Sequence, residues 1–286
     1  MLACFVVMVS YRLTGFRSLH RFLGAHPALA QACGLPEGQV PSDCTFGRRF
    51  RRLDGVLLAA TAQLVRRLTS RRLLRWTLTV IDATLVRAKG RHPKGKRVDR
   101  RTTDREAKWG FSTTRGWVWG YKLHALVAVR PVILPVAWTV TPAHRNDVTQ
   151  LLPVVTQARR RGREHIRDVA GDTAYDSVSR YHRLARWAIR LTTPINRRRG
   201  GCPSPLQQKR RRYVRTPRGR WLMKRRADVE RFFSQDKGVF VVDPLPVVGR
   251  TTVRTYLSLV LVTYLFGVVY NGAAHRPPRA LKSLVA

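Results

Sequence analysis

The sequence predicts an α/β protein in which a mixed sheet is flanked by helices and preceded by an all-helical module. Apolar, β-branched runs follow one another closely between residues 77 and 140, a spacing typical of consecutive antiparallel strands. Two further short runs, at residues 165–170 and 189–195, are separated by helical patterns. Strands joined through helices are usually parallel, so these two should extend the sheet as parallel strands.

Residues 1–75 are expected to form the helical module. Residues 2–13 are apolar enough to make a buried helix, and an amphipathic helix follows Gly15. Ser42 and its neighbours can cap the next helix, and Asp54 can cap another. Arginines near the end of that last helix would complement its dipole and give the module a basic surface.

The pattern changes to strands after residue 76. Residues 78–86 form the first strand by their β-branched content, and residues 117–129 and 132–140 read as two strands joined like a hairpin. The charged, poorly periodic stretch between the first two strands, residues 88–109, is predicted to be a mobile loop.

The rest of the chain alternates between helices and short strands. In chain order we expect a helix at 153–161, a strand at 165–170, a helix at 175–187, a strand at 189–195, a basic segment punctuated by Gly and Pro at 197–226, and helices at 227–237 and 253–270. The complete order is therefore three antiparallel strands followed by two parallel ones, with helices on the faces of the sheet.

The charge of the chain is extreme. It has 55 Lys and Arg against 16 Asp and Glu, a formal net charge of +39. Nucleic acid is the polyanionic partner that this charge favours, well ahead of an anionic membrane or a polyphosphate. A hydrophobic fraction of 44% is enough for a real core and excludes a disordered basic tail.

Cysteines and apolar segments indicate a cytoplasmic protein without membrane spans. The four cysteines are scattered, with no pair at zinc spacing, and are interpreted as reduced, buried thiols. The apolar residues 2–9 and 255–270 fall short of the ~20 residues that a span needs, so both are interpreted as core helices.

Three acids stand out in this basic chain. Asp82 interrupts the first strand, Asp172 follows the fourth strand, and Glu230 lies on a late helix. Taken singly, each has an ordinary alternative: an ion pair with Arg for Asp82, a turn or cap for Asp172, and a solvated helix position for Glu230. If strands one and four are neighbours, however, the two aspartates can face each other across a metal site that Glu230 completes.

Such a site suits phosphoryl transfer. Two hard cations about 3.5–4 Å apart can activate an attacking oxygen and stabilise the leaving one. Mg²⁺ keeps several waters and uses few protein ligands, so three carboxylates suffice.

Two other polar residues receive a structural interpretation, and one basic segment a functional one. His124 is interpreted as a satisfied core histidine that could also point toward the site, and Asp147 as a helix cap. The cluster Lys209, Arg210, Arg211 and Arg212, followed by Tyr213, combines cations with an aromatic face, which suits DNA ends; its alternative is a solvated basic loop.

Five segments, taken in order, carry a resemblance to a known family. They are Val80-Ile81-Asp82-Ala83-Thr84; Trp119-Gly120-Tyr121-Lys122-Leu123-His124; residues 140–147, from Val140 to Asp147; residues 170–177, from Ala170 to Ser177; and Arg226-x3-Glu230-x6-Lys237. As a set, they resemble the DDE transposases of bacterial insertion sequences, whose catalytic core is RNase H-like.

The resemblance implies a site and an activity. Asp82, Asp172 and Glu230 would be the catalytic, metal-binding triad, and Arg226 and Lys237 would contact DNA phosphates near the cut. The family uses Mg²⁺ or Mn²⁺, with two ions expected, to cleave element ends and join them to target DNA. Met223 stands where the family signature has Tyr.

The resemblance also implies an organisation and partners. Residues 1–75 would bind DNA ends, residues 76–272 would form the RNase H-like catalytic domain, and residues 273–286 a basic tail. The partners would be the terminal inverted repeats and target DNA, the assembly a homodimer or a larger synaptic complex, and the location the cytoplasm, at the nucleoid.

Three functions remain to be separated. The first is an active transposase, and the second is a truncated or decayed copy that binds DNA without cutting. The third, a ribosome-associated basic protein, makes no use of the three acids.

Overall fold

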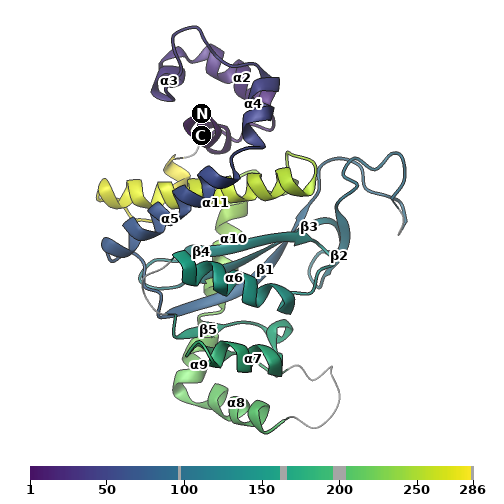
Figure 1. Ribbon diagram of the computed structural model, residues 1–286, viewed down its shortest axis with the longest axis vertical. Coiled ribbons are helices and arrows are strands. Elements are labelled where there is room, and N and C mark those ends of the chain that lie inside the picture. The colour runs from purple at the N-terminus through teal and green to yellow at the C-terminus, as the bar shows by residue number, and fades with distance from the viewer. Residues whose placement is uncertain (96–97, 162–165, 196–203, 285–286) are drawn as a thin grey trace.

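The computed structural model describes residues 1–95, 98–161, 166–195 and 204–284 (Figure 1). Five helices precede the sheet, as predicted for residues 1–75. They are α1 (Leu2–Ser10), α2 (Phe16–Ala25), α3 (Pro27–Ala32), α4 (Asp43–Phe50) and α5 (Asp54–Ser70). Helices α2 to α4 gather at one end of the molecule, and α5 lies between them and the sheet (Figure 1).

The two predicted helix caps have different outcomes. Ser42 caps α4, because its hydroxyl accepts a hydrogen bond from the Thr45 N–H at 3.4 Å. Asp54 does not cap α5: its carboxylate accepts hydrogen bonds from Arg254 and, at 2.9 Å, from Thr255 of a helix 200 residues later. The acid at the start of α5 therefore joins two distant parts of the chain.

The central sheet has the expected mixture of directions. Its strands are β1 (Leu78–Arg87), β2 (Lys108–Ser112), β3 (Gly116–Ala128), β4 (Leu134–Pro142), β5 (Asp168–Ala170) and β6 (Arg190–Thr192). Strands β4, β3 and β1 are antiparallel, whereas β5 and β6 continue from β1 as parallel neighbours. Three antiparallel strands followed by two parallel ones is the predicted order.

One strand was not predicted. β2 lies at the end of the stretch interpreted as a mobile loop, and it pairs with the first five residues of β3, while β4 pairs with the rest. The cross-strand rings of Trp109 and Trp119 meet edge to face with centroids 5.4 Å apart, a contact that stabilises strand pairing. The loop before β2 is anchored as well, since the buried Asp104 accepts hydrogen bonds from its neighbours.

Helices cover both faces of the sheet. α6 (Val148–Arg161) packs against β3 and β4, and α10 (Ala227–Val239) packs against β1 on the other side (Figure 1). Beyond β5, the 3₁₀ turn Thr173–Tyr175 leads to α7 (Val178–Ala185), which contacts β6. The basic segment between β6 and α10 is more regular than expected, because its described part forms α8 (Pro205–Arg215) and α9 (Pro217–Lys224).

Helix α11 (Arg250–Ala273) lies at the centre of the molecule (Figure 1). It contacts α1, α5 and β4. By length and hydropathy it is one helix that could cross a membrane, yet 72% of its apolar window is buried inside the protein. The interpretation of residues 255–270 as a core helix agrees with this burial, and the short turn Leu281–Leu284 packs back onto the same helix.

The cysteines depart in part from the prediction. Cys4 and Cys33 are free, buried thiols, but Cys44 is exposed on α4 because it points away from the apolar face that carries Phe46 and Phe50. Cys202 lies outside the described residues.

Candidate active site

The register of the sheet brings Asp82 and Asp172 to the same level along two neighbouring strands. β1 and β5 run in parallel, and their last paired residues are Val80 and Ala170. Asp82 and Asp172 each lie two residues further along. β1 is buried on either side of Asp82–Thr84 but only half-buried at these three residues, so the strand opens toward solvent where the first acid lies.

Asp172 is fixed by the turn that follows β5. Its carboxylate accepts a hydrogen bond from the Ala174 N–H at 2.9 Å and caps the 3₁₀ turn. The preceding Gly171 allows close packing, because a Cβ there would lie 3.1 Å from Tyr175 and 3.2 Å from Ile81. The sequence interpretation of Asp172 as a cap and the one as a site residue are therefore compatible.

The surroundings of both aspartates oppose their ionisation. Burial raises the pKa of Asp82 to about 7; the Ala83 N–H, which donates to its Oδ1 at 2.8 Å, works against this shift, and the charge of Asp172 adds to it. Burial also raises the pKa of Asp172, with a further contribution from the charge of Asp147. The two acids thus form a desolvated, mutually repelling pair.

Arg226 is the cation that compensates this pair. Its charge lowers the pKa of both aspartates, and its Nη2 lies 3.7 Å from Glu230 Oε1 one helical turn along α10. One guanidinium therefore lies within reach of all three predicted acids.

Glu230 is not itself brought to the aspartate pair. Its side chain is 57% exposed, and its charge is not among the largest contributions to the pKa shift of either aspartate. Among the described residues no three His, Cys, Asp or Glu side chains lie close enough together to hold a metal ion. The predicted triad is thus present as a pair plus a third acid joined to it through Arg226.

Lys237 ties α10 to the sheet. Its Nζ donates to Thr84 Oγ1 at 2.7 Å and to the Leu85 carbonyl at 3.1 Å, two and three residues beyond Asp82. Burial lowers the pKa of Lys237. In this structure the amine is occupied by β1, whereas the guanidinium of Arg226, at the other end of the same helix face, lies at the acids.

Asp147 is a site residue that the sequence interpretation missed. The predicted helix cap is instead its neighbour: Asn146 Oδ1 accepts the Val148 N–H at 3.3 Å. The Asp147 carboxylate accepts a hydrogen bond from Lys122 Nζ at 2.8 Å and contributes to the raised pKa values of Asp82 and Asp172. An acid in the short connection between a strand and a helix, in a chain with so few acids, was the signal that could have found it.

His124 is buried, as expected, and only partly satisfied. Its Nε2 lies 2.9 Å from Thr141 Oγ1, while its Nδ1 is buried without a hydrogen-bond partner among the described residues and lies 3.6 Å from Asp147 Oδ1. Burial, with help from Lys122, lowers the pKa of His124 to about 3, so the imidazole is neutral at physiological pH.

The donor set fits a divalent cation in chemical type. Asp82 and Asp172 offer carboxylate oxygens, the ligands that Mg²⁺ and Mn²⁺ prefer, at a point where burial leaves their negative charge poorly compensated. A bound cation would favour the ionised form of both carboxylates, against the burial that raises their pKa values.

The predicted cationic cluster on α8 divides into two groups. Arg210 is a structural residue: its guanidinium stacks on the ring of Tyr181 and donates to the Leu191 carbonyl. Lys209, Arg211 and Arg212 are exposed. Of the four predicted residues, these three are the ones that present unburied charge on α8.

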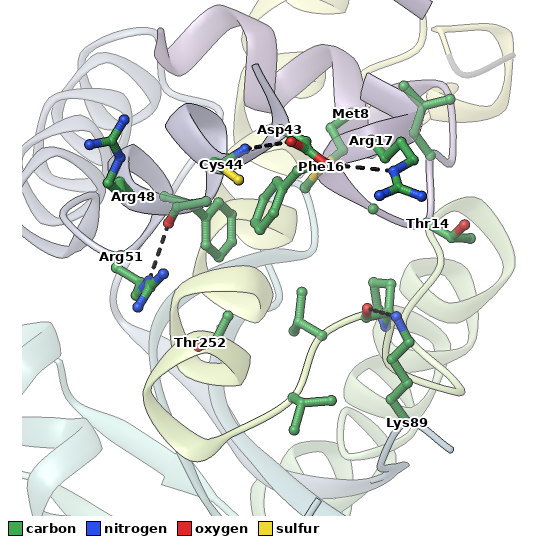
Figure 2. Close-up of a pocket in the computed structure, with 17 residues that line it drawn as sticks. Met8, Thr14, Phe16, Arg17, Asp43, Cys44, Arg48, Arg51, Lys89 and Thr252 are labelled. Carbon is green, nitrogen blue, oxygen red and sulfur yellow. Dashed lines mark hydrogen bonds and ion pairs between the residues drawn. The ribbon is translucent and has the colours of Figure 1, made fainter. Parts of the chain in front are cut away.

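A separate hollow of about 610 Å³ lies between the N-terminal helices and the chain around residues 246–252 (Figure 2). Its rim carries Arg17, Arg48, Arg51 and Lys89. Its one lining acid, Asp43, is engaged by Arg17 at 3.6 Å and by the Cys44 N–H at 2.8 Å. The hollow is therefore basic and contains no pair of free acids, so it is unsuited to the metal chemistry expected at Asp82.

Comparison with known protein families decides which family this site belongs to. The model of the transposase DDE domain matches residues 77–266, about two thirds of the chain. The chain belongs to this family. It is a DDE transposase of the insertion-sequence type, which places it among proteins of DNA transposition and recombination. No curated protein matches the chain.

Proposed function

We propose that the chain cleaves DNA at the ends of an insertion sequence and transfers the freed ends into target DNA, using divalent metal ions. The observation that carries the proposal is the placement of Asp82 and Asp172 at equivalent positions, two residues past the last pair of the parallel strands β1 and β5, where both are desolvated within a strongly basic protein. The order of the antiparallel and parallel strands further supports an RNase H-like core around them.

Asp82, Asp172 and Glu230 would hold the metal ions, with two ions expected. When bound, Mg²⁺ or Mn²⁺ lowers the pKa of an attacking hydroxyl and stabilises charge on the transferring phosphate. The chain's own contributions are to hold the two aspartates apart from bulk water and to orient them through the N–H groups of Ala83 and Ala174.

The cations of the site divide between binding DNA and holding the structure. Arg226, half-exposed beside the acids, is placed to contact a phosphate near the cut. Lys237 would position α10 through Thr84 and could reach DNA only after leaving that contact. Lys209, Arg211 and Arg212 would extend the phosphate track, with Arg210 supporting their helix.

The basic hollow supports the proposal that residues 1–75 bind DNA ends. Its rim arginines lie on α2 (Arg17), on α4 (Arg48) and directly after α4 (Arg51), and Lys89 adds a cation two residues beyond the end of β1 (Figure 2). Simultaneous cleavage of two element ends would require the homodimer or larger synaptic assembly that the family resemblance implies, acting on DNA in the cytoplasm.

The position of Glu230 favours a second candidate, a DNA-binding protein that does not cut. With Glu230 paired to Arg226, the metal-binding set is complete only if α10 or the Glu230 side chain moves. The two candidates share DNA binding and differ in chemistry, so one experiment separates them.

The test uses purified protein, a supercoiled plasmid that carries the terminal inverted repeats, and Mg²⁺ or Mn²⁺. Wild type should nick and join the ends, and Asp82→Asn, Asp172→Asn and Glu230→Gln should each abolish both steps while retaining DNA binding. Glu37→Gln, which alters an exposed glutamate, is the matched control and should remain active. Binding without any nicking in either metal would reject the enzyme and leave the second candidate.

A further inference from the structure

Two aromatic side chains near the turn of the β2–β3 hairpin are the most exposed large apolar residues in the part of the chain that the structure describes. Trp117 is 68% exposed and Phe111 is 60% exposed. They are direct partners across the two strands, and their rings meet edge to face with centroids 5.4 Å apart. This aromatic pair therefore turns a large apolar surface toward solvent, which is a mark of an interaction site.

The aromatic pair is the open end of a row of four rings. Trp109 and Trp119 are the next partners on the same face of the hairpin, two residues further along each strand. The loop before β2 covers these inner rings: Nε1 of Trp109 donates to the Gly95 carbonyl at 3.1 Å, and Nε1 of Trp119 donates to the Asp104 carbonyl at 3.2 Å. The cover ends there, so the two outer rings stay open.

The loop that covers the inner rings is strongly basic, and it projects from the end of the sheet where β2 and β3 lie (Figure 1). Of its three acids in the described residues 88–95 and 98–107, Asp104 is buried and hydrogen-bonded. The exposed cations in the same residues are Lys89, Arg91, Lys94, Arg100, Arg101 and Arg105. Exposed rings beside a row of cations are the combination that binds single-stranded nucleic acid, because the cations hold phosphates and the rings stack on bases.

The aromatic pair also lies on the face of the sheet that carries Asp82. Antiparallel partners project from the same face, and the partner of Asp82 on β3 is Ala125. Trp117 precedes Ala125 by eight residues on the same strand, an even number, so both side chains project from one face. Eight strand residues extend about 27 Å, which corresponds to about eight nucleotides of a DNA strand.

We propose that Phe111 and Trp117 form a stacking platform for the unpaired bases of single-stranded DNA, whose phosphates are held by the cations of the adjoining loop. The inference rests on the proposed function for its partner, because it takes DNA as the polyanion that this protein binds. It adds a second contact site, away from the acids, and the form of DNA that this site prefers. Bases inside a duplex stack on one another, so the platform favours single strands over duplex.

Two other roles of the aromatic pair lead to different expectations. As a cross-strand contact alone, it stabilises the hairpin and has no effect on DNA binding. As a contact between two copies of the chain, it would bring two strongly basic loops together, and two rings supply far less than the roughly 800 Å² that each partner buries in a standard interface. Charge and area therefore favour nucleic acid as the partner.

The experiment measures the binding of the full chain to a short single-stranded oligonucleotide and to the same sequence as a duplex, by fluorescence anisotropy. Trp117→Ala should weaken single-strand binding about tenfold, which is within the range for the loss of one base–aromatic stack, and should leave duplex binding nearly unchanged. A fluorescent adenine analogue in the single strand should be quenched less by Trp117→Ala than by wild type. Trp117→Phe, which keeps a ring, should retain most of the affinity.

Three further variants separate stacking from general binding and from misfolding. Trp117→Ala should leave the salt dependence of single-strand binding unchanged, whereas Arg101→Gln should reduce it, because each lost phosphate contact lowers the slope. Tyr270→Ala removes another exposed aromatic side chain, 54% exposed on α11, and is the matched control that should leave both affinities unchanged. If Trp117→Ala fails to fold, Trp117→Thr, which favours a strand, carries the same expectation.

Equal single-strand affinity in wild type and Trp117→Ala overturns the inference, and so does an equal loss for single strand and duplex. A change of oligomeric state in Trp117→Ala, measured by sedimentation velocity with DNA affinity unchanged, would make the aromatic pair a contact between copies. If wild type nicks the plasmid and Trp117→Ala binds single strands normally, only the platform is wrong. If wild type binds neither form of DNA, the proposed function fails as well.

Discussion

Asp104 and Asp82 show two ways of taking a carboxylate out of water. Asp104 is 1% exposed, and it accepts hydrogen bonds from the Tyr121 hydroxyl at 2.9 Å and from the N–H groups of Glu106 and Gly249, each at 3.1 Å. For Asp82, the described residues supply one hydrogen bond, from the Ala83 N–H, together with the repulsion of Asp172.

The difference separates a structural acid from a functional one. Asp104 joins the loop before β2, strand β3 and the start of α11, and donors from all three segments satisfy it. The negative charge of Asp82 is poorly compensated, and a bound cation would compensate it. Such perturbed acids are typical of functional sites. Asp104 therefore stabilises the fold, whereas an ionised Asp82 destabilises it.

The largest effect is expected at Asp82, where DNA cleavage and stability should respond differently to substitution. Asp82→Asn should reduce DNA cleavage by roughly 10³-fold, since a metal-stabilised transition state is worth several kcal/mol. Because burial raises the folded-state pKa of Asp82 to about 7, the ionised form destabilises the fold above that pH, and the metal-free variant should be at least as stable as wild type at pH 8. Plasmid nicking and urea unfolding measure the two effects, and marked destabilisation would make Asp82 structural.

The reverse outcome is expected at Asp104. Asp104→Ala should lower the free energy of unfolding by about 3 kcal/mol, because it leaves donors from three segments without an acceptor. Urea unfolding followed by circular dichroism measures the loss, and Asp104→Asn, which keeps one acceptor oxygen, should lose less. If Asp104→Ala is as stable as wild type, Asp104 is not a structural acid and does not differ from Asp82 in this respect.

Asp236 tests whether burial alone reproduces the behaviour of Asp82. Its Oδ1 has no hydrogen-bond partner among the described residues, and burial raises its pKa to about 7, with only Lys237 opposing; Tyr256 and Tyr264 lie near. Because the unfolded-state pKa is near 4, the stability associated with its protonated form is complete below pH ~4 and is lost as the pH rises through about 7.

Replacement of Asp236 should remove that dependence. Asp236→Asn should be more stable than wild type at pH 8, by on the order of 2 kcal/mol, and the difference should shrink toward pH 4. Paired urea titrations at pH 4.5, 6 and 8 measure it. A constant difference across the three pH values would show that Asp236 is ionised throughout.

The smallest effect on stability is expected at Glu230. Because this side chain is 57% exposed and its pair with Arg226 is long, at 3.7 Å, Glu230→Gln should change the free energy of unfolding by less than about 0.5 kcal/mol. Its effect on cleavage should nonetheless equal that of Asp82→Asn. A thermal scan beside the nicking assay checks both, and retained cleavage would remove Glu230 from the site.

The strands that carry the aspartates could be predicted because their signal is local. Residues 78–86 are β-branched and apolar, and Asp172 follows directly on a short apolar run, so both the elements and their pairing follow from pattern and from the rules of strand connection. β2 was missed because its five residues include Gly110 and follow a long charged stretch, so no alternation marks it.

The rest of the site depends on orientations that spacing does not encode. Asp147 has the sequence context of a cap, and only the folded turn shows that Asn146 takes the role. Arg210 looks like its neighbours in a basic run, yet it stacks on Tyr181 from a distant helix. Glu230 was placed by its motif, whereas its distance from the aspartates depends on how α10 crosses β1.

The position of helix α11 near the end of the chain limits how far the protein can fold during its synthesis. The helix packs against α1, α5 and β4, and its Thr255 donates a hydrogen bond to Asp54 at the start of α5. The N-terminal helices and the sheet are therefore synthesised before α11, the helix that packs against both. A chain interrupted before residue 250 would leave both apolar surfaces open, making it a substrate for proteases rather than a smaller DNA-binding protein.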